Sequence, residues 1–257
     1  STKALNGSIT EIEEDTEMNY NDDETILTLT YDKQDAVQVG EKTYKTIQEA
    51  INTIEDNSQG IIKVIKNITY TKQDTGVYIS QNKNIILDLN GYAIKFAVSN
   101  QAILNDGILE IMDSSSEKSG YITENAEVTI KNNEGAILRI VDSKIMNVSS
   151  NVISNQGQLI IDIGKIYAVS GKITSDNGNI ITITGKAIVN QNNGNVQILD
   201  GIISGSISNI GTGKIEMNNG DISGGIVNYS SGIIEIIEGT ITPTEGEYAI
   251  FNQAEKR

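Results

Sequence analysis

The sequence predicts an all-β fold, a coil of stacked parallel strands with about 7–9 rungs and an α-helix capping its N-terminal end. Three observations predict it. Glycines recur in two series that move together, the triplet Ile-x-Asn recurs beside them, and only one stretch has the periodicity of a helix. Repeats of roughly 16–22 residues with three short strands each are typical of a solenoid rather than a sandwich.

Residues 1–36 are predicted to form an acidic linker with an entry strand. The acidic residues cluster at 11–17 and 21–24, and the alternating run at 25–31 (Thr-Ile-Leu-Thr-Leu-Thr-Tyr) has the period of a strand. A linker of this kind suggests that the chain has flanking domains in a larger protein. The remaining residues, 37–257, are predicted to form one β-helix domain.

The helix that would cap this domain is predicted near 46–55. Four apolar residues recur there at the spacing of one helix face: Ile47, Ala50, Ile51 and Ile54. Thr46 followed three residues later by Glu49 has the pattern of a capping box, which marks a helix start. Such a helix would cover the open apolar end of the coil.

Two glycine series define the predicted rungs. The first series is Gly157, Gly178, Gly194, Gly213 and Gly232, and the second, always seven residues later, is Gly164, Gly185, Gly201, Gly220 and Gly239. Earlier rungs fit with small edits, Gly107 leading to Ser114 and Gly135, one residue late, to Ser143. In most rungs the positions two and four after the first glycine are apolar, as in Leu159 and Ile161, so both side chains would face inward.

An asparagine recurs two residues after an isoleucine, just before the next rung begins. Its predicted members are Asn105, Asn132, Asn155, Asn190, Asn209, Asn228 and Asn252. The series breaks once, where Ser175 follows Ile173. Asparagine amides bond readily to neighbouring backbone, and stacked on one another they would form a ladder along one corner of the coil.

The first part of the predicted domain resembles a known family. The stretches 44–51 (Tyr-Lys-Thr-Ile-Gln-Glu-Ala-Ile), 61–65 (Ile-Ile-Lys-Val-Ile) and 84–94 (Asn-Ile-Ile-Leu-Asp-Leu-Asn-Gly-Tyr-Ala-Ile) are similar to the start of pectate-lyase-like right-handed parallel β-helix domains, in particular those of bacterial cell-surface proteins. The resemblance runs from about residue 37 to the end and implies a right-handed coil. That superfamily includes lyases, hydrolases, adhesins and phage fibres, so it leaves the function open.

Composition excludes several functions. Lys and Arg number 19 against 34 Asp and Glu, and the net charge of −15 disfavours binding to nucleic acid or an anionic membrane surface. The chain has no His and no Cys, which removes Ser-His-Asp triads, thiol nucleophiles, His-ligated metals and disulfides. No apolar run is long enough for membrane insertion.

The resemblance to lyases makes Arg139 a candidate ligand-binding or basic residue. Lyases of that family use an Arg or Lys base beside several Ca²⁺-binding aspartates. Here Arg139 has only Glu110 and Asp142 in its surroundings, and no second Arg is placed to hold a sugar carboxylate. A solvated surface arginine is the interpretation that the sequence favours, and no catalytic residue is assigned.

A Ca²⁺ ion is the only cofactor that the sequence suggests, and only weakly. Asp200, Asn219 and Glu238 align just before the second glycine of three consecutive rungs. Like charges about 5 Å apart repel, and a cation between Asp200 and Glu238 would relieve that repulsion. Exposed, screened carboxylates with no bound ion are the favoured alternative, so no cofactor is expected.

Four tyrosines are the candidates for carbohydrate contact, because aromatic rings can pack against sugar faces. They are Tyr92, Tyr121, Tyr167 and Tyr229. They do not recur at one rung position, so each can equally be a half-buried edge residue.

Two functions from different classes fit these observations. The first is a non-catalytic extracellular module of a bacterial surface protein, a stalk or adhesin whose partners are host or environmental glycans or proteins. The second is a polysaccharide-binding or polysaccharide-degrading β-helix, with a cleft formed by the longer connections at 114–125 or 144–152. The missing catalytic residue types favour the first.

Overall fold

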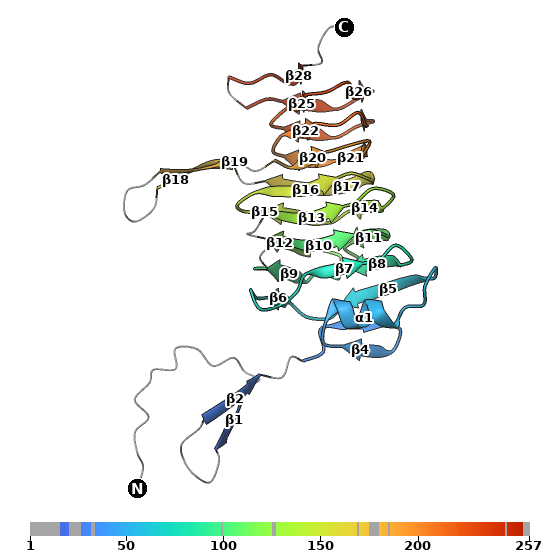
Figure 1. Cartoon of the computed structure of the whole chain (residues 1–257), viewed down its shortest axis with the longest axis vertical. Coiled ribbons are helices and arrows are strands. Elements are labelled where there is room, and N and C mark those ends of the chain that lie inside the picture. Colours follow the sequence, from blue (N-terminus) through green and yellow to red (C-terminus); the bar gives the residue numbers. More distant parts are fainter. Residues whose placement is uncertain are drawn as a thin grey trace. The chain divides into compact units, whose positions relative to one another are not determined.

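A computed structural model describes residues 16–20, 27–31, 34–98, 100–124, 127–168, 170–174, 180–184, 186–244 and 246–253 (Figure 1). The described residues are all-β apart from one α-helix, and most strand pairs are parallel. The chain divides into two compact units, Ser1–Asp35 and Ala36–Arg257. No helix among the described residues is long and apolar enough to span a bilayer.

The first unit contains a two-stranded antiparallel sheet. Its strands are β1 (Thr16–Tyr20) and β2 (Leu27–Tyr31), with Thr16 opposite Tyr31 and Tyr20 opposite Leu27. The alternating run at 25–31 contains β2. Its partner β1 lies among residues that the sequence analysis assigned to a linker, because Thr16–Tyr20 is too polar to stand out as a strand by itself.

The second unit is built from three columns of stacked strands. The first column consists of β5 (Gln59–Val64), β8 (Asn84–Asp88), β11 (Ile108–Met112), β14 (Ile137–Val141), the first half of β17 (Gln158–Ala168), the first half of β21 (Asn195–Ser204), β23 (Lys214–Met217) and β26 (Ile233–Ile236). The second column consists of β6 (Ile68–Tyr70), β9 (Ala93–Phe96), β12 (Tyr121–Glu124), β15 (Lys144–Asn147), the second halves of β17 and β21, β24 (Asp221–Ser223) and β27 (Thr240–Thr242). The third column consists of β7 (Val77–Ile79), β10 (Gln101–Asn105), β13 (Val128–Asn132), β16 (Asn151–Asn155), β20 (Ile188–Asn190), β22 (Ile207–Asn209), β25 (Ile226–Asn228) and β28 (Ile250–Asn252).

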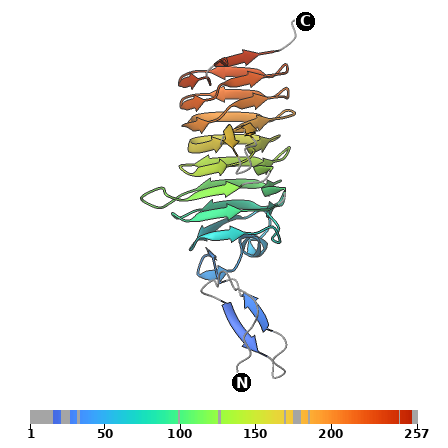
Figure 2. The ribbon, with the colours of Figure 1, turned by 90° about the vertical axis from the view of Figure 1, so that its left-hand side faces the viewer.

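The chain passes through the three columns in turn, and each passage is called a layer below. Every strand pairs in parallel with the strand of the same column in the layer before it, as β10 does with β7 and β13 with β10. Figure 2 shows these layers stacked one on another. The first two columns belong to one 16-stranded sheet because β17 and β21 run through both without a break. This path is compatible with the coil predicted from the sequence.

The N-terminal end of the second unit carries the predicted helix. Two short antiparallel strands, β3 (Val37–Val39) and β4 (Lys42–Tyr44), precede α1 (Ile47–Thr53). The Thr46 side chain accepts a hydrogen bond from the Glu49 amide at 3.1 Å and so caps the first turn. The helix ends at Thr53, earlier than the expected residue 55, because Ile54 is extended. Its apolar face packs against β3, β4, β5 and β7.

Stacked apolar side chains fill the space between the columns. Alternate residues of each strand point inward, and the register stacks apolar residues on apolar residues in successive layers. One such row in the first column is Leu109, Leu138, Leu159, Val196, Ile215 and Ile234. All are buried except Ile234 in the last described layer, which is partly exposed because no further layer among the described residues covers it.

One predicted rung, the one built on Gly178 and Gly185, is wrong. The strand β19 (Ile180–Thr184) pairs antiparallel with β18 (Ser170–Thr174) in a separate two-stranded sheet, and not with the columns. The columns skip this segment, since Ile153 pairs directly with Ile188 and Gly164 with Gly201. Gly178 and Gly185 themselves lie outside the described residues. The segment between Ala168 and Lys186 is therefore an insertion, named the hairpin insertion here.

The small-residue rows differ from the prediction at one early position. Ile108 pairs with Ile137, so Gly107 aligns with Ala136, which is the one-residue shift predicted for the Gly135 rung. Tyr121 pairs with Lys144, so Gly120 rather than Ser114 aligns with Ser143. In later layers the glycines are required, because Gly201 has a φ of +138° and a Cβ there would collide with the carbonyl oxygen of Gly164.

Candidate functional site

The structure brings all seven ladder asparagines together at the end of the third column. The Nδ2 of each of the first six donates to the Oδ1 of the asparagine in the next layer. The six distances, from the Asn105–Asn132 pair to the Asn228–Asn252 pair, are 2.7, 2.8, 2.8, 2.9, 3.0 and 3.1 Å. The first six side chains are buried, and Asn252 in the last layer is exposed.

Each buried amide also bonds to backbone beside it. Asn190 Nδ2 donates to the carbonyl oxygen of Gly194 at 2.6 Å, and Asn209 and Asn228 repeat this bond with Gly213 and Gly232. These bonds hold the corner that leads into the next layer. A buried amide without partners would cost about 1–3 kcal/mol, so the ladder is stable only when the layers are in register.

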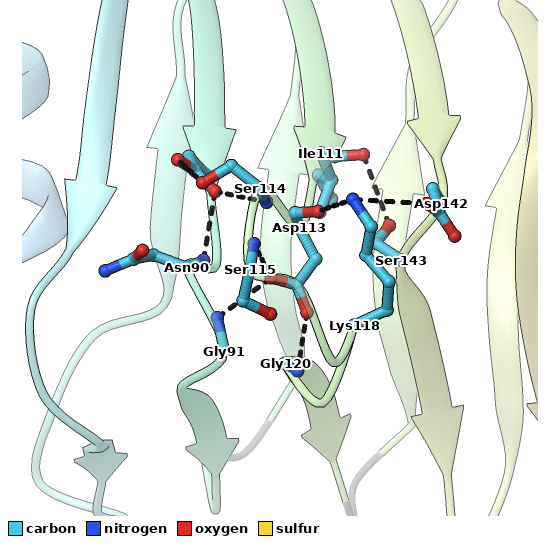
Figure 3. A network of polar contacts seen from close by, with 11 residues as sticks. Asn90, Gly91, Ile111, Asp113, Ser114, Ser115, Lys118, Gly120, Asp142 and Ser143 are labelled. Carbon is cyan, nitrogen blue, oxygen red and sulfur yellow. Dashed lines mark hydrogen bonds and ion pairs between the residues drawn. The ribbon is translucent and has the colours of Figure 1, made fainter.

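A second polar network lies at the connection between β11 and β12 (Figure 3). The buried Asp113 carboxylate accepts three backbone hydrogen bonds, from Gly91 at 2.8 Å, Ser115 at 3.0 Å and Gly120 at 2.6 Å. Lys118 closes the loop by donating to the Asp113 carbonyl oxygen at 2.6 Å and by pairing with Asp142 at 3.2 Å. Neither stretch predicted as a long connection is a loop throughout. Residues 121–124 of the stretch 114–125 form β12, and the loop before this strand is held at its start by Asp113. The stretch 144–152 contains β15 and the first residues of β16.

The neighbouring Asp88 has the same role one layer earlier. Its carboxylate accepts hydrogen bonds from the Asn90 amide at 3.0 Å, the Ser114 amide at 2.9 Å and the Ser114 hydroxyl at 2.7 Å.

Burial by itself would raise the pKa of the Asp113 carboxyl. The hydrogen bonds from Ser115, Gly120 and Gly91 outweigh it and lower that pKa below its ordinary value. Carboxylates engaged in this way organise loops and are not poised for acid–base chemistry.

Arg139 lies on the outer face of the first column, directly between two carboxylates. Its guanidinium bonds to Glu110 at 3.2 Å and to Asp162 at 2.6 Å. The hydrogen bond to Asp162 is the main cause of a raised pKa for Arg139, and it outweighs the opposing effect of burial. An arginine held charged by two acids is less able to abstract a proton. This position therefore gives no support to the lyase chemistry considered from the sequence.

Asp200, Asn219 and Glu238 occupy the same position in three consecutive layers. The strand pairs before and after this position have the same residue offset between layers, so the residues between them align as well. Asp200 Oδ1 accepts a hydrogen bond from the Gly201 amide at 2.7 Å, and Asn219 and Glu238 are exposed. Opposite Asp200 in the layer before is Asp162, which is engaged by Arg139. Within the described ranges no group of three or more acidic residues is arranged to hold a metal ion.

The four candidate tyrosines do not come together. Tyr92 packs against the apolar core, Tyr121 is partly buried beside the Asp113 loop, and Tyr167 lies between Met146 and Ser204 on the second column. Tyr229 is different, because its ring is 47% exposed and the Lys186 ammonium lies 5.5 Å from its centroid.

Tyr229 and Lys186 line a depression of about 590 Å³ at the corner between the second and third columns. Half of its other lining residues are small hydroxyl residues from successive layers, among them Ser204, Ser208, Ser223 and Thr242. Ala168 and Lys186, the two ends of the hairpin insertion, also line it. We name this feature the corner depression. The sequence analysis found only Tyr229, although serine or threonine recurs at 204, 223 and 242, exactly nineteen residues apart, in the sequence.

Comparison with known proteins gives no match. No family model matches the sequence, and neither a curated protein nor a solved structure matches the chain.

Proposed function

We propose that residues 37–257 form a right-handed parallel β-helix that acts as a non-catalytic, extracellular module of a bacterial surface protein. In this role the coil is a rigid stalk that presents an adhesive surface to host or environmental glycans or proteins. The asparagine ladder is the observation that carries the proposal. Six consecutive amide–amide hydrogen bonds of 2.7–3.1 Å require the layers to be directly superimposed, which is the geometry of a coil.

A stalk needs length and stiffness, and the architecture supports both. Eight layers at about 4.8 Å each give a rod of about 38 Å. Each layer is tied to the next by backbone bonds in three columns and by the ladder. The net charge of the whole chain, −15, favours solubility and an exposed location over contact with nucleic acid.

The competing function, cleavage of a polysaccharide, has weaker support. Both acids beside Arg139 are engaged in ion pairs with it, and the buried acids of the Asp113 network are saturated by backbone donors. A lyase or hydrolase would need a group free to take or give a proton at a substrate.

Three measurements test the proposal. Small-angle scattering of residues 37–257 should give a rod-shaped particle, and antibodies to the module should label intact cells of the source organism. A compact globular scattering profile, or labelling only after the cells are permeabilised, contradicts it. An assay for unsaturated products from polyuronides, read by absorbance, should show no turnover. Turnover that the substitution Arg139→Ala abolishes would contradict the non-catalytic role and identify the chain as an enzyme.

A further inference from the structure

The corner depression has a shape that the backbone imposes. Two glycines form its floor, Gly205 with a φ of +118° and Gly224 with a φ of +129°. A Cβ at Gly224 would lie 2.6 Å from the carbonyl carbon of Gly205, so no side chain fits there. The glycines therefore let consecutive layers approach closely at this corner, and hydroxyl side chains of the same layers line the depression. Its volume of about 590 Å³ is within the range of small-molecule sites.

Ser208 lies at the side of this hollow with an unused hydroxyl. Its neighbours in β22, Ile207 and Asn209, point inward to the core and the ladder, so Ser208 points to the outer face where the depression lies. The residue is fully buried, and its Oγ has no hydrogen-bond partner. A buried hydroxyl without a partner is costly. A ligand with hydroxyl groups would satisfy it.

Lys186 provides a positive charge without a matching acid. Among the residues that the structure describes, no carboxylate forms an ion pair with its ammonium, which lies over the Tyr229 ring. Partial burial lowers the pKa of the Lys186 amine from its ordinary value. A ligand anion at this position would stabilise the charged amine.

We propose that the corner depression binds a sugar that carries a carboxylate, at the end of a glycan. The sugar carboxylate pairs with the Lys186 ammonium, and the exposed Tyr229 ring packs against the apolar face of the pyranose. Ser204, Ser208, Ser223 and Thr242 exchange hydrogen bonds with its hydroxyls, as does the exposed Glu247 at the same depression. This inference rests on the proposed adhesive role and names the ligand class for it.

The test is calorimetric titration of the full chain with three glycosides. Methyl glucuronide and the methyl glycoside of N-acetylneuraminic acid carry a carboxylate, and methyl glucoside is the neutral match for the first. At least one acidic glycoside should bind about 10-fold or more tightly than methyl glucoside, since a charge-assisted bond has that effect. Which acidic glycoside binds distinguishes uronic from sialic acid as the source.

Variants locate the site. Lys186→Gln should weaken binding of the acidic glycoside about 10-fold, whereas Tyr229→Ala should weaken every glycoside that binds. Lys131→Gln, a lysine on the outer face of the same column several layers away, is the matched control and should bind as the unaltered chain does. Thermal melts of each variant show whether it is folded.

Three results would overturn the inference. The first is equal affinity for the acidic and neutral glycosides, and the second is unchanged affinity in a folded Lys186→Gln variant. The third is the absence of any heat of binding at about 10 mM ligand, because a minimal site with millimolar affinity would be occupied at that concentration. None of these would affect the rod shape or the labelling of intact cells, so failure of this inference is distinguishable from failure of the proposed function.

Discussion

At the scale of single residues, buried polar side chains determine which layers stack on which. Asn190 is fully buried, accepts from Asn155 at 2.8 Å and donates to Asn209 at 2.9 Å and to Gly194 at 2.6 Å. An apolar residue at this position could still be buried, but the Oδ1 of Asn209 and the carbonyl oxygen of Gly194 would lose the donor that Asn190 provides. The ladder therefore specifies register, which isoleucine stacking alone does not.

Replacing an inner asparagine of the ladder should lower the stability of the protein far more than replacing the last one. Asn190→Ala should lower the free energy of unfolding by about 3 kcal/mol, because buried donors and acceptors lose their partners. Asn252→Ala, at the exposed end, is the matched control and should cost less than about 1 kcal/mol. Urea unfolding followed by circular dichroism measures both. Equal losses in the two variants would mean that the ladder does not contribute through its buried bonds.

The Asp113 carboxylate predicts a dependence of stability on pH. Its pKa is lowered in the folded state, so its contribution is complete above the unfolded pKa of about 4 and is lost as pH falls through the folded value. Asp113→Asn should cost about 2 kcal/mol at pH 7, since an NH2 group replaces one of the two oxygens that accept these bonds, Oδ1 from Gly91 and Ser115 and Oδ2 from Gly120. The difference between the two proteins should shrink at pH 3. A difference that is the same at both pH values contradicts this explanation.

The asparagine ladder could be predicted from the sequence, but the hydrogen-bond partners of the buried acids could not. The Ile-x-Asn triplets are regular enough to predict that Asn105 to Asn252 share one corner. The partners of Asp113, which are Gly91, Ser115 and Gly120, come from loops whose shape has no repeat. Local repeats predict columns, whereas loop hydrogen bonds depend on contacts between layers that one sequence does not display.

At the scale of elements, the hairpin insertion shows how a repeat can mislead. Gly178 and Gly185 matched the glycine spacing, so the segment was predicted to be a rung. Two exceptions to the pattern lie in it, with Ser175 where asparagine was expected and Thr182 where the other rungs have an apolar residue. The pair Asn177-Gly178 is also a common hairpin signal. Exceptions that cluster in one segment are evidence against its membership in the repeat.

Deleting residues 169–185, which joins Ala168 to Lys186, should leave the columns intact. The next two layers turn the same corner with only Gly205–Ser206 and Gly224–Gly225, and β16 already pairs directly with β20. The melting temperature should change by less than about 5 °C, because a surface insertion contributes little to the core. Calorimetry checks this. Loss of a cooperative transition would show that the insertion is part of the stack.

At the scale of the whole second unit, stability should not be uniform. In a stacked architecture each layer is stabilised by its neighbours, and the last described layer has a neighbour on one side only. Its inward residues Ile234, Ile236 and Ile241 are only partly buried, whereas their counterparts in the layer before, such as Ile215 and Met217, are fully buried. At the opposite end, α1 and β3 cover the first layers.

Hydrogen exchange should therefore be fastest in the last layer. Amides of β26, β27 and β28 should exchange at least about 10-fold faster than those of β14 and β16, since local opening there exposes less buried surface. Exchange followed by mass spectrometry resolves the layers as separate peptides. Uniform protection along the unit would show that it unfolds as one cooperative block.

The asparagine ladder also gives the coil an electrical direction. Every Nδ2 donates toward the C-terminal layer, so the six amide dipoles point the same way and polarise one another, as in a chain of hydrogen-bonded amides. A single reversed amide would face donor to donor on one side and acceptor to acceptor on the other. The row therefore has one orientation or its complete opposite, and any coil that continued it end to end would have to preserve that polarity.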